Sequence, residues 1–478
     1  MNLETPCVVD LDGTLLNSDS LHESILKIIF ENPLMLLRLP FWLLRGKAFF
    51  KSKVANLGEI DASTLPYNIE LIDWLKLQKE AGRPLVLCTA ADTKVAKKIA
   101  NFLGIFDEVI ASEGTLNLAG RNKGEALKRK YGEKGFDYAG NAAVDLDVWQ
   151  YARKAVVVNA RRSVQQRAAK CCEVDVLMPR NNSKFSAVIR ALRLHQWLKN
   201  ILLFVPMLAA HEISSMGSII NVALGFLAFS LTASSVYLVN DLSDLDSDRR
   251  HPRKQKRPFA AGDIPLFYGV VLSPVLLCFG FLIGSYINNG FLLWLLGYLF
   301  ITTLYTFFLK RLVLIDCLTL AFLYTLRIVA GGAAVEQQLS FWLLAFAVFL
   351  FWSLALVKRN AELNAAGVKQ QGKVNGRGYI EGDGPLVLAM GVAAYYSAVL
   401  VFALYLNSDA ITLLYKLPEI MWIEVPILLF WMSWMWLQSH RLNMHDDPLV
   451  FAVKDPVSVL SGLLFTLVAI VASLGLPL

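Results

Sequence analysis

The chain has 478 residues, of which 55% are hydrophobic and only 18% are charged, and its formal net charge is +7. Soluble proteins usually have about a quarter of their residues charged, so this composition excludes a wholly soluble globular protein. Many of the charges lie before residue 190, and long apolar runs follow residue 200. We therefore expect a soluble domain over residues 1–185 and a membrane domain over residues 186–478, with no nucleic-acid partner.

The first motif is CVVDLDGT, an apolar run that ends in two acidic residues, Asp10 and Asp12. This pattern predicts a β-strand with two carboxylates at its carboxyl end, the edge at which α/β folds build their sites. The alternative is a polar turn in which both acids are solvated. The first residues have no basic stretch, apolar core and cleavage site in the order of a signal peptide, so we expect this domain to fold in the cytosol.

The D-x-D-G-T motif resembles the first motif of the haloacid dehalogenase phosphatases. Two further family-like segments follow in the expected order, RPLVLCTAAD with Thr89 and RNKGEAL with Lys123. The resemblance implies a Rossmann-like α/β domain in which Asp10 is the nucleophile and Asp12 the general acid/base. It also implies that Thr89 binds phosphoryl oxygens and that Lys123 neutralises the phosphorylated intermediate.

The fourth segment of this resemblance, YAGNAAVDLDVW, corresponds to the acidic metal-binding motif. It implies a Mg²⁺ ion held by Asp10, Asp12, Asn141 and Asp145. Asn141 stands where the family usually has an aspartate, so the site has one negative charge fewer, although an amide oxygen can still bind Mg²⁺. The alternative to a working phosphatase is a degenerate domain with a regulatory or structural role.

Helical patterning separates the first two of these motifs. The segments LHESILKIIF and NIELIDWLKLQKEA both read as helices, and the spacing resembles a helical cap over residues of about 17–80. Between them, PLMLLRLPFWLLRGKAFF is apolar but is interrupted by prolines and basic residues. It is too broken to cross a membrane, so we expect it either to lie at the membrane surface or to pack against the membrane domain.

The membrane domain has nine candidate spans, since a spanning helix needs about 20 mostly apolar residues. They are centred near residues 207, 229, 276, 299, 323, 348, 396, 428 and 466, and Pro206 makes the first one weak. The loops after the second, fourth, sixth and eighth spans are rich in Lys and Arg, whereas the opposite loops have only Lys416. This asymmetry predicts that the basic loops face the cytosol.

The loop after the second span begins with NDLSDLDSDRRHPRKQKRP, residues 240–258. Its spacing predicts that four residues share one helix face, namely Asn240, Asp241, Asp244 and Asp248. Carboxylates placed so closely repel each other unless a cation lies between them, and oxygen ligands suit Mg²⁺. The basic run that follows suits a phosphorylated ligand. The alternative is a loop of scattered charges beside lipid headgroups.

NDLSDLDSD matches the N-D-x-x-D-x-x-x-D motif of the UbiA superfamily of intramembrane prenyltransferases, which the membrane domain therefore resembles. The resemblance implies an all-α bundle of nine transmembrane helices in which this motif binds Mg²⁺ and a diphosphate. The superfamily usually has a second D-x-x-x-D motif after the sixth span. This chain has LVKRNAEL there, so Lys358 and Arg359 replace the acids.

Four segments resemble the decaprenyl-phosphate phosphoribosyltransferases: NDLSDLDSDRRHPRKQKRPFAAG, LRLHQWLKNILLFVP, LRIVAGGAA and LVKRNAEL. The resemblance implies 5-phosphoribosyl diphosphate as donor and a polyprenyl phosphate as acceptor. Asp241, Asp244 and Asp248 would then act on the departing diphosphate. The implied donor-binding residues are Asn240, His251, Lys254, Arg257, Lys358 and Arg359, and Lys199 would meet the lipid phosphate.

The segment YTFFLKRLVLID adds two residues to this expected site. It resembles a Y-x-x-x-L-K-x-x-x-x-x-D pattern that recurs in the superfamily, which places Lys310 and Asp316 near the donor. Arg327, in the same span as Asp316, is expected to face a cavity or to pack against a neighbouring helix, because charged residues inside spans are costly.

Together the two resemblances predict a bifunctional enzyme of the inner membrane with both sites on the cytosolic side. Transfer of 5-phosphoribose to the lipid leaves a phosphate on the product, and the N-terminal domain is expected to remove it. One alternative is an aromatic or quinone prenyltransferase that uses a polyprenyl diphosphate. Another is a transporter with a regulatory cytosolic domain, although no inverted repeat is evident.

Overall fold

The computed structural model describes residues 5–113, 118–179, 184–211, 215–367, 378–408, 411, 414–444 and 447–475. The chain forms two compact units. Unit 1 consists of Met1–Leu192 and Tyr237–Ser273, and unit 2 consists of Arg193–Val236 and Pro274–Leu478. The aspartate-rich segment is thus part of the same unit as the N-terminal domain, which the sequence did not indicate. Within the expected join near 180–190, residues 180–183 lie outside the described residues.

A six-stranded parallel sheet forms the centre of unit 1. Its strands lie in the order β3-β2-β1-β4-β5-β6. Their bounds are β1 Cys7–Val9, β2 Leu85–Asp92, β3 Glu108–Ser112, β4 Asp137–Gly140, β5 Lys154–Val158 and β6 Glu173–Met178. The strand order reverses between β1 and β4, and ligands in such sheets bind where this reversal occurs. The predicted α/β fold of the N-terminal domain is confirmed.

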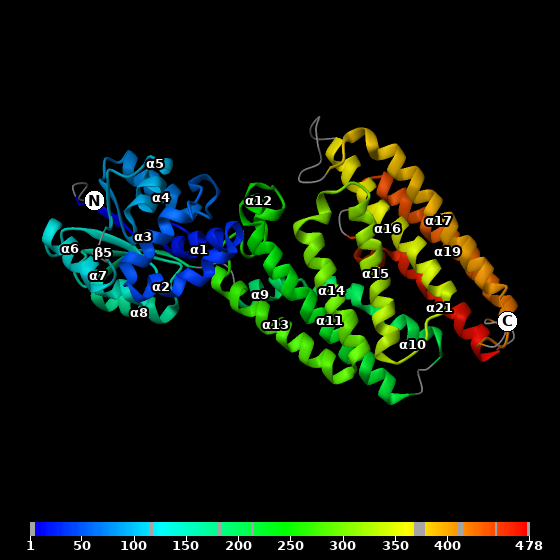
Figure 1. The fold of residues 1–478 in the computed structure, drawn as a ribbon. Coiled ribbons are helices and arrows are strands. Elements are labelled where there is room, and N and C mark those ends of the chain that lie inside the picture. Colours follow the sequence, from blue (N-terminus) through cyan, green and yellow to red (C-terminus); the bar gives the residue numbers. More distant parts are fainter. Residues whose placement is uncertain are drawn as a thin grey trace. The chain divides into compact units, whose positions relative to one another are not determined.

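Helices connect and cover these strands (Figure 1). Those between β1 and β2 are α1 Ser20–Glu31, α2 Leu39–Leu44, α3 Lys47–Leu57 and α4 Ile69–Glu80. The later ones are α5 Thr93–Leu103, α6 Arg121–Tyr131, α7 Leu146–Trp149 and α8 Arg162–Cys171. Two helices that follow the last strand, α9 Lys184–Leu192 and α12 Leu245–Arg250, also belong to unit 1. Side-chain caps explain two of the starts, because Asp19 accepts from Leu21 N and His22 N, and Asn68 accepts from Leu71 N.

Part of the region between β1 and β2 exposes apolar side chains. Leu34, Leu37, Phe41 and Leu44 are between 68% and 85% exposed. They lie in a 3-10 helix, Pro33–Arg38, and in α2, both of which are too short to cross a membrane. Contact with a membrane surface and packing on unit 2 would both use exposed apolar side chains of this kind. These exposures do not separate the two roles, so both stay predictions.

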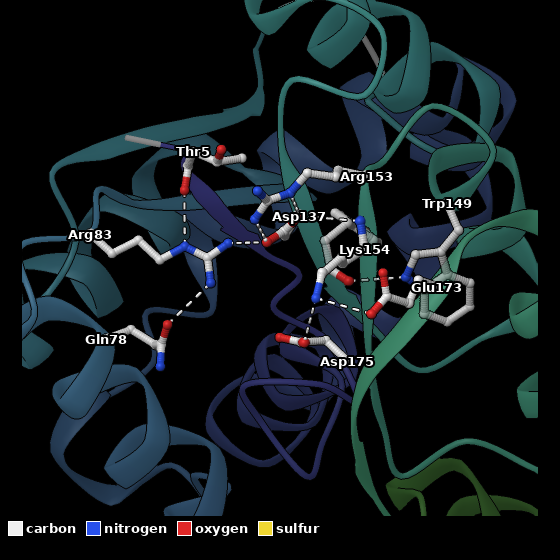
Figure 2. Close-up of polar contacts among 10 residues, drawn as sticks. Thr5, Gln78, Arg83, Asp137, Trp149, Arg153, Lys154, Glu173 and Asp175 are labelled. Carbon is white, nitrogen blue, oxygen red and sulfur yellow. Dashed lines mark hydrogen bonds and ion pairs between the residues drawn. The ribbon is translucent and has the colours of Figure 1, made fainter. Parts of the chain in front are cut away.

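A buried ion-pair network holds the edge of the sheet opposite the predicted site (Figure 2). Asp137, at the start of β4, is 2% exposed. It accepts hydrogen bonds from Arg153 Nε at 2.9 Å and Arg153 Nη2 at 2.7 Å, and it pairs with Arg83. Arg83 also donates to Thr5 O and Gln78 Oε1. One carboxylate therefore joins the starts of β2, β4 and β5, and Arg83 extends the network to Thr5, just before β1.

Replacing this carboxylate should destabilise unit 1. In Asp137→Asn, Arg83 stays buried at 6% exposure without its counterion. Breaking such a pair by removing one partner costs about 3–5 kcal/mol. We expect a clear fall in the unfolding midpoint of unit 1, measured by denaturant titration. Asp175→Asn is the control, because Asp175 pairs with Lys154 at the surface. Equal midpoints for the two variants would contradict this account.

Unit 2 is a bundle of long apolar helices (Figure 1). In the described residues, eight helices are long and apolar enough to cross a membrane. They are Met216–Ser243 (α11), Leu266–Ile287 (α13), Asn289–Phe307 (α14), Ile315–Ala334 (α15), Phe341–Asn364 (within α16, Phe341–Gly367), Gly384–Leu406 (α17), Pro418–His440 (ending in α19, Glu424–His440) and Pro456–Leu474 (α21). The unit boundaries fall inside α11 and α13.

The predicted span near residue 207 is not one of these eight helices. Residues Leu194–Phe204 form a 3-10 helix, and only Val205–Ala209 (α10) is α-helical. Pro206 lies in the first turn of α10, where its fixed φ and missing N–H are tolerated. Proline is tolerated at the start of a helix but not in its interior, so Pro206 and the preceding 3-10 turns explain why the segment does not form one long α-helix. A further short helix, α20 Pro448–Lys454, precedes α21.

Candidate active sites

The predicted phosphatase residues meet where the strand order reverses. Asp10 follows β1, and Lys123 Nζ donates to its Oδ1 at 2.6 Å. The same ammonium donates to the Tyr138 hydroxyl at 3.0 Å, which in turn donates to Asp145 Oδ1 at 2.9 Å. All four side chains are buried or nearly so. The sheet thus brings three of the predicted residues, Asp10, Lys123 and Asp145, into one network through a tyrosine.

Burial sets the protonation of this network. It raises the pKa of Asp10 to about 6, against the lowering effect of Lys123. Burial and the charge of Asp19 raise the pKa of Asp12 to about 7. Burial alone would lower the pKa of Lys123, but the neighbouring carboxylates outweigh it, so its pKa lies above the usual value. A cationic Lys123 beside Asp10, the predicted nucleophile, and an Asp12 able to hold a proton suit phosphoryl transfer.

The other predicted residues of this site lie around the D-x-D-G-T loop. Asp12 Oδ1 accepts from Ser20 N at 2.7 Å. Gly13 has a φ of +77°, and a Cβ there would lie 2.2 Å from Asn141 Nδ2, so only glycine allows Asn141 to approach. Thr89, at the end region of β2, is fully buried, and its hydroxyl accepts from Ala91 N.

Asp145 orders the loop that presents Asn141. Its Oδ2 accepts from Asn141 N and Ala142 N, both at 2.9 Å. Because its other oxygen accepts from Tyr138, its present contacts position Asn141, a predicted metal ligand. Direct metal binding by Asp145 stays a prediction.

The aspartate-rich segment spans two helices and not one. Asp244 lies between α11 and α12, with a φ of −94° and a ψ of 13°. The expectation of one continuous helix is therefore wrong at Asp244. Asp241 and Asp248 nevertheless meet at Arg257, whose Nη1 donates to their carboxylates at 3.1 and 2.5 Å. An arginine thus bridges the two acids that the sequence assigned to a metal site.

These acids fit a Mg²⁺ ion by their chemistry. In the part of the chain that the structure describes, no three His, Cys, Asp or Glu side chains form a group able to hold a metal. Mg²⁺, however, usually takes only one or two carboxylates together with phosphate oxygens and water. Asp248 Oδ1 is buried and accepts no hydrogen bond from the described residues. An acceptor in this state suits a cation supplied with a substrate.

The basic residues after this segment differ in their accessibility. Arg257 is 26% exposed and Lys254 is 43% exposed, with its Nζ 3.9 Å from Asp248 Oδ1. His251 Nδ1 lies within hydrogen-bonding distance of Arg253 N and Lys254 N. Burial and the charge of Lys254 lower the pKa of His251. We therefore expect its imidazole to be neutral and to donate a hydrogen bond. Asn240, at the end region of α11, is half-buried.

A second cluster of charges lies inside unit 2. Lys199 and Lys358 both donate to Asp447 Oδ2, at 2.8 and 3.3 Å. Asp447 also accepts from the Tyr324 hydroxyl and is 7% exposed. These residues come from the 3-10 helix Leu194–Phe204, α16, α15 and the turn before α20. The two lysines predicted to bind different phosphates therefore share one carboxylate.

Arg359 and Asp316 form a separate buried pair. Both are fully buried, and Arg359 also pairs with Glu362. Asp316 Oδ1 accepts from the Tyr379 hydroxyl at 2.7 Å. Donor binding by either residue stays a prediction, and in this arrangement the two Nη atoms of the guanidinium pair with two carboxylates. Lys310, which lies in a 3-10 turn, Leu309–Arg311, is half-buried.

Arg327 packs inside unit 2, one of the two roles expected for it. Its Nε donates to Asn200 Oδ1 at 2.9 Å, and its guanidinium lies over the rings of Tyr298 and Tyr324.

Sequence reasoning missed three residues of these sites. Tyr138 reads as a core residue of a strand, and Asp447 is a single acid in a loop without spacing to another motif. Lys51 lies on α3, lines a cavity of about 60 Å³ together with Asp12, and donates to Ala90 O at 2.7 Å. The one sequence signal that could have suggested Lys51 is its place within the predicted helical cap, the region of about residues 17–80.

Comparison with known proteins adds to this geometry. The uncharacterized protein y4nM of Sinorhizobium fredii is 37% identical over 462 residues, which cover 96% of this chain and 89% of that protein. The decaprenyl-phosphate phosphoribosyltransferase of Mycolicibacterium smegmatis is 33% identical over 187 residues, which cover 38% of this chain and 58% of that enzyme. A substrate-bound phosphoserine phosphatase structure is similar to 38% of this chain and 96% of its own, with 15% identity and a TM-score of 0.28.

The family model fits the membrane part of the chain. Residues 201–457 match the model of the UbiA prenyltransferase family. This range is more than half of the 478 residues and contains the aspartate-rich segment together with Lys358 and Asp447, while Lys199 lies just before it. The chain belongs to the UbiA prenyltransferase family.

Proposed function

We propose that this multi-pass membrane protein transfers 5-phosphoribose from phosphoribosyl diphosphate to a polyprenyl phosphate. We further propose that its N-terminal domain removes the 5-phosphate from the lipid product. The identity to decaprenyl-phosphate phosphoribosyltransferases supports the first step, although it covers only 58% of the M. smegmatis enzyme. The network of Asp10, Lys123 and Asp145 supports the second step.

The observation that carries the proposed transfer is the pair of lysines at Asp447. The superfamily usually has a second pair of acids after the sixth span, and that pair would bind a further metal ion. This chain has Lys358 in that segment, which gives the site positive charge instead. Lys199, expected to meet the lipid phosphate, lies within hydrogen-bonding distance of the same carboxylate oxygen, so we assign Lys358 to the acceptor and not to the donor that the resemblance implied. Two ammonium groups with one carboxylate leave a net positive site, which suits the phosphate of an acceptor lipid. A neutral phenol acceptor would gain no electrostatic attraction from this positive charge.

In the proposed transfer, an oxygen of the lipid phosphate forms the new bond to ribose C1. The bond between C1 and the diphosphate oxygen breaks, and the diphosphate leaves with its electron pair. The acceptor is already an anion, so the site needs no strong general base. Arg257 and Lys254 can pair with the charge that develops on the leaving group, while Asp241 and Asp248 keep Arg257 in place.

One or two of the three carboxylates of Asp241, Asp244 and Asp248, together with Asn240, would hold Mg²⁺ along with oxygens of the diphosphate. A bound Mg²⁺ ion neutralises phosphate oxygens and so lowers the cost of the departing negative charge.

In the proposed second step, an Asp10 oxygen attacks the 5-phosphorus and forms an aspartyl-phosphate. Asp12 donates a proton to the departing ribose O5 and then accepts one from the water that hydrolyses the intermediate. Lys123 Nζ stays close to Asp10 Oδ1 and offsets the negative charge. Asp10, Asp12 and Asn141 would hold the Mg²⁺ of this site.

We place both steps at the cytosolic side of the inner membrane. Unit 1 is one compact body that holds both the N-terminal domain and Tyr237–Ser273, so the chain returns at residue 237 to the side that it left after Leu192. Basic residues are concentrated in the loops of that side, as the positive-inside rule requires of a cytosolic face.

A diphosphate-release assay tests the donor and the acceptor. Purified protein in detergent should release inorganic diphosphate only when Mg²⁺, phosphoribosyl diphosphate and a polyprenyl phosphate are all present. Release that needs an aromatic acceptor and a polyprenyl diphosphate instead would assign the aromatic prenyltransferase activity. Release from phosphoribosyl diphosphate without any lipid would contradict the proposed acceptor.

Removing one lysine of the pair should weaken acceptor binding. A hydrogen bond to a charged group contributes about 1.5–3 kcal/mol, so Lys358→Gln should raise the KM for polyprenyl phosphate by about 10- to 100-fold. The KM for the donor should change less. Lys454→Gln is the control, because Lys454 ends α20 and is exposed. An unchanged acceptor KM in Lys358→Gln would rule out this role for the lysine pair.

A further inference from the structure

Helix α1 contacts both candidate sites of unit 1. Its first residue, Ser20, donates its backbone N–H to Asp12 Oδ1 at 2.7 Å, beside the proposed phosphatase nucleophile. Glu23, in the same first turn, is 6% exposed and accepts from the Ser18 hydroxyl at 2.6 Å. A buried carboxylate is costly unless it is paired, so the partner of Glu23 matters for the position of this helix.

That partner is Arg249, the residue after Asp248. Arg249 Nη2 and Nη1 donate to Glu23 Oε1 and Oε2 at 2.6 and 3.1 Å. Both side chains are at most 6% exposed, and Arg249 Nε also donates to Ala260 O at 3.2 Å. This two-point geometry fixes the direction of the guanidinium as well as its distance. The pair therefore holds α12, which contains Asp248, against α1.

Three further contacts join the same two parts of unit 1. Thr64 Oγ1 donates to Asp246 at 3.0 Å, and Arg250 pairs with Asp61 at 2.7 Å. Gly262 has a φ of +74°, and a Cβ there would lie 2.7 Å from the backbone oxygen of Asn17, so the approach of the two segments requires glycine.

Between these contacts a cavity of about 150 Å³ lies against α1, residues 60–65 and Leu242–Asp246. Apolar packing is thus incomplete here, and the polar contacts have to position the segment.

We propose that Glu23 is a positioning residue for the transferase, acting through Arg249 on the aspartate-rich segment. The N-terminal domain then has two roles, since it performs its own reaction and also supports the loop on which the transfer depends. This inference rests on the proposed function only for its activity measurement.

The physical reason is the precision that the transfer requires. Asp241, on α11, and Asp248, on α12, hold Arg257 together, so a small rotation of α12 relative to α11 moves Asp248 away from the position in which both acids contact Arg257. A displacement of about 1 Å in an active site can reduce a rate by roughly 10²-fold. Without the Glu23 carboxylate, the polar contacts of α12 to this part of unit 1, among the described residues, are the exposed Arg250–Asp61 pair and the hydrogen bond from Thr64 to Asp246.

The test compares Glu23→Gln, Arg249→Met and the double variant in the full-length protein. We expect kcat for phosphoribosyl transfer to fall by about 10- to 100-fold in each single variant. The double variant should lose no more than the worse single variant, because both changes break one contact. Asp61→Asn, which breaks the exposed Arg250 pair, should stay within about twofold. Losses that multiply in the double variant would overturn the proposal.

Hydrogen exchange provides a measurement that does not need the reaction. Amides of residues 240–250 should exchange faster in Glu23→Gln and Arg249→Met than in the wild type and in Asp61→Asn. Unchanged exchange would overturn the positioning role. Faster exchange with an unchanged kcat would overturn its importance for transfer. A wild-type protein without any transferase activity would refute the proposed function, and exchange would still decide whether the pair holds the segment.

Discussion

Asp10→Asn should stop the second step and leave the first intact. The protein should then accumulate polyprenyl-phosphoryl 5-phosphoribose, which the wild type converts to its dephosphorylated form. Loss of a nucleophile reduces a rate by roughly 10³-fold or more, because the amide cannot form the aspartyl-phosphate. The structure favours this effect over a loss of folding, since Asn keeps an oxygen at the position that faces Lys123.

The measurement is the ratio of the two lipid products over time. The Asp10→Asn variant should give diphosphate release at the wild-type rate, which separates the two sites. If the variant produces the dephosphorylated lipid as fast as the wild type, Asp10 is not the nucleophile and the coupled reaction is wrong. Asn141→Asp, which restores the usual family acid, should keep the phosphatase active.

Asp248→Asn should abolish the transfer with little change in unfolding. Asp248 is 1% exposed, one of its oxygens accepts from Arg257, and the other lies 3.9 Å from Lys254 Nζ and accepts no hydrogen bond from the described residues. Losing the charge of Asp248 weakens both its ion pair with Arg257 and the affinity of the site for Mg²⁺. Loss of one preorganised charged contact to a leaving group costs about 10²- to 10³-fold in rate. We expect this loss together with a higher Mg²⁺ requirement, measured as initial rate against Mg²⁺ concentration.

The matched control is Asp246→Asn, on the same short helix. Asp246 is exposed and has a single hydrogen bond from Thr64, so its neutralisation should change the rate only a few-fold. Equal losses in the two variants would show that the helix needs total negative charge and not a specific ligand, which would contradict the site proposed for Asp248.

The sequence predicted the elements whose signal is local. Asp10 and Asp12 follow an apolar strand, and that pattern survives in the sheet because parallel strands end at a common edge. Eight of the nine expected spans are long apolar helices, for which composition alone suffices. The segment near residue 207 failed because Pro206 and a 3-10 helix interrupt it.

The remaining part of the sites depends on contacts between distant residues. Asp447 lies 248 residues after Lys199, and the pairing follows from how helices pack and not from any motif. Glu23 and Arg249 are 226 residues apart, in parts of the chain that the sequence assigned to different domains. Phosphate binding by Arg359 stays a prediction, and its contacts with the buried Asp316 and with Glu362 became visible only in three dimensions.

The most direct test is mass spectrometry of the lipid products. Purified protein is incubated with Mg²⁺, phosphoribosyl diphosphate and a polyprenyl phosphate, beside Asp244→Ala and Asp10→Asn. The account predicts a lipid that carries ribose without its 5-phosphate in the wild type, the same lipid with the 5-phosphate in Asp10→Asn, and no new lipid in Asp244→Ala. A wild-type protein that produces no ribosylated lipid, but does prenylate an aromatic acceptor from a polyprenyl diphosphate, would contradict it.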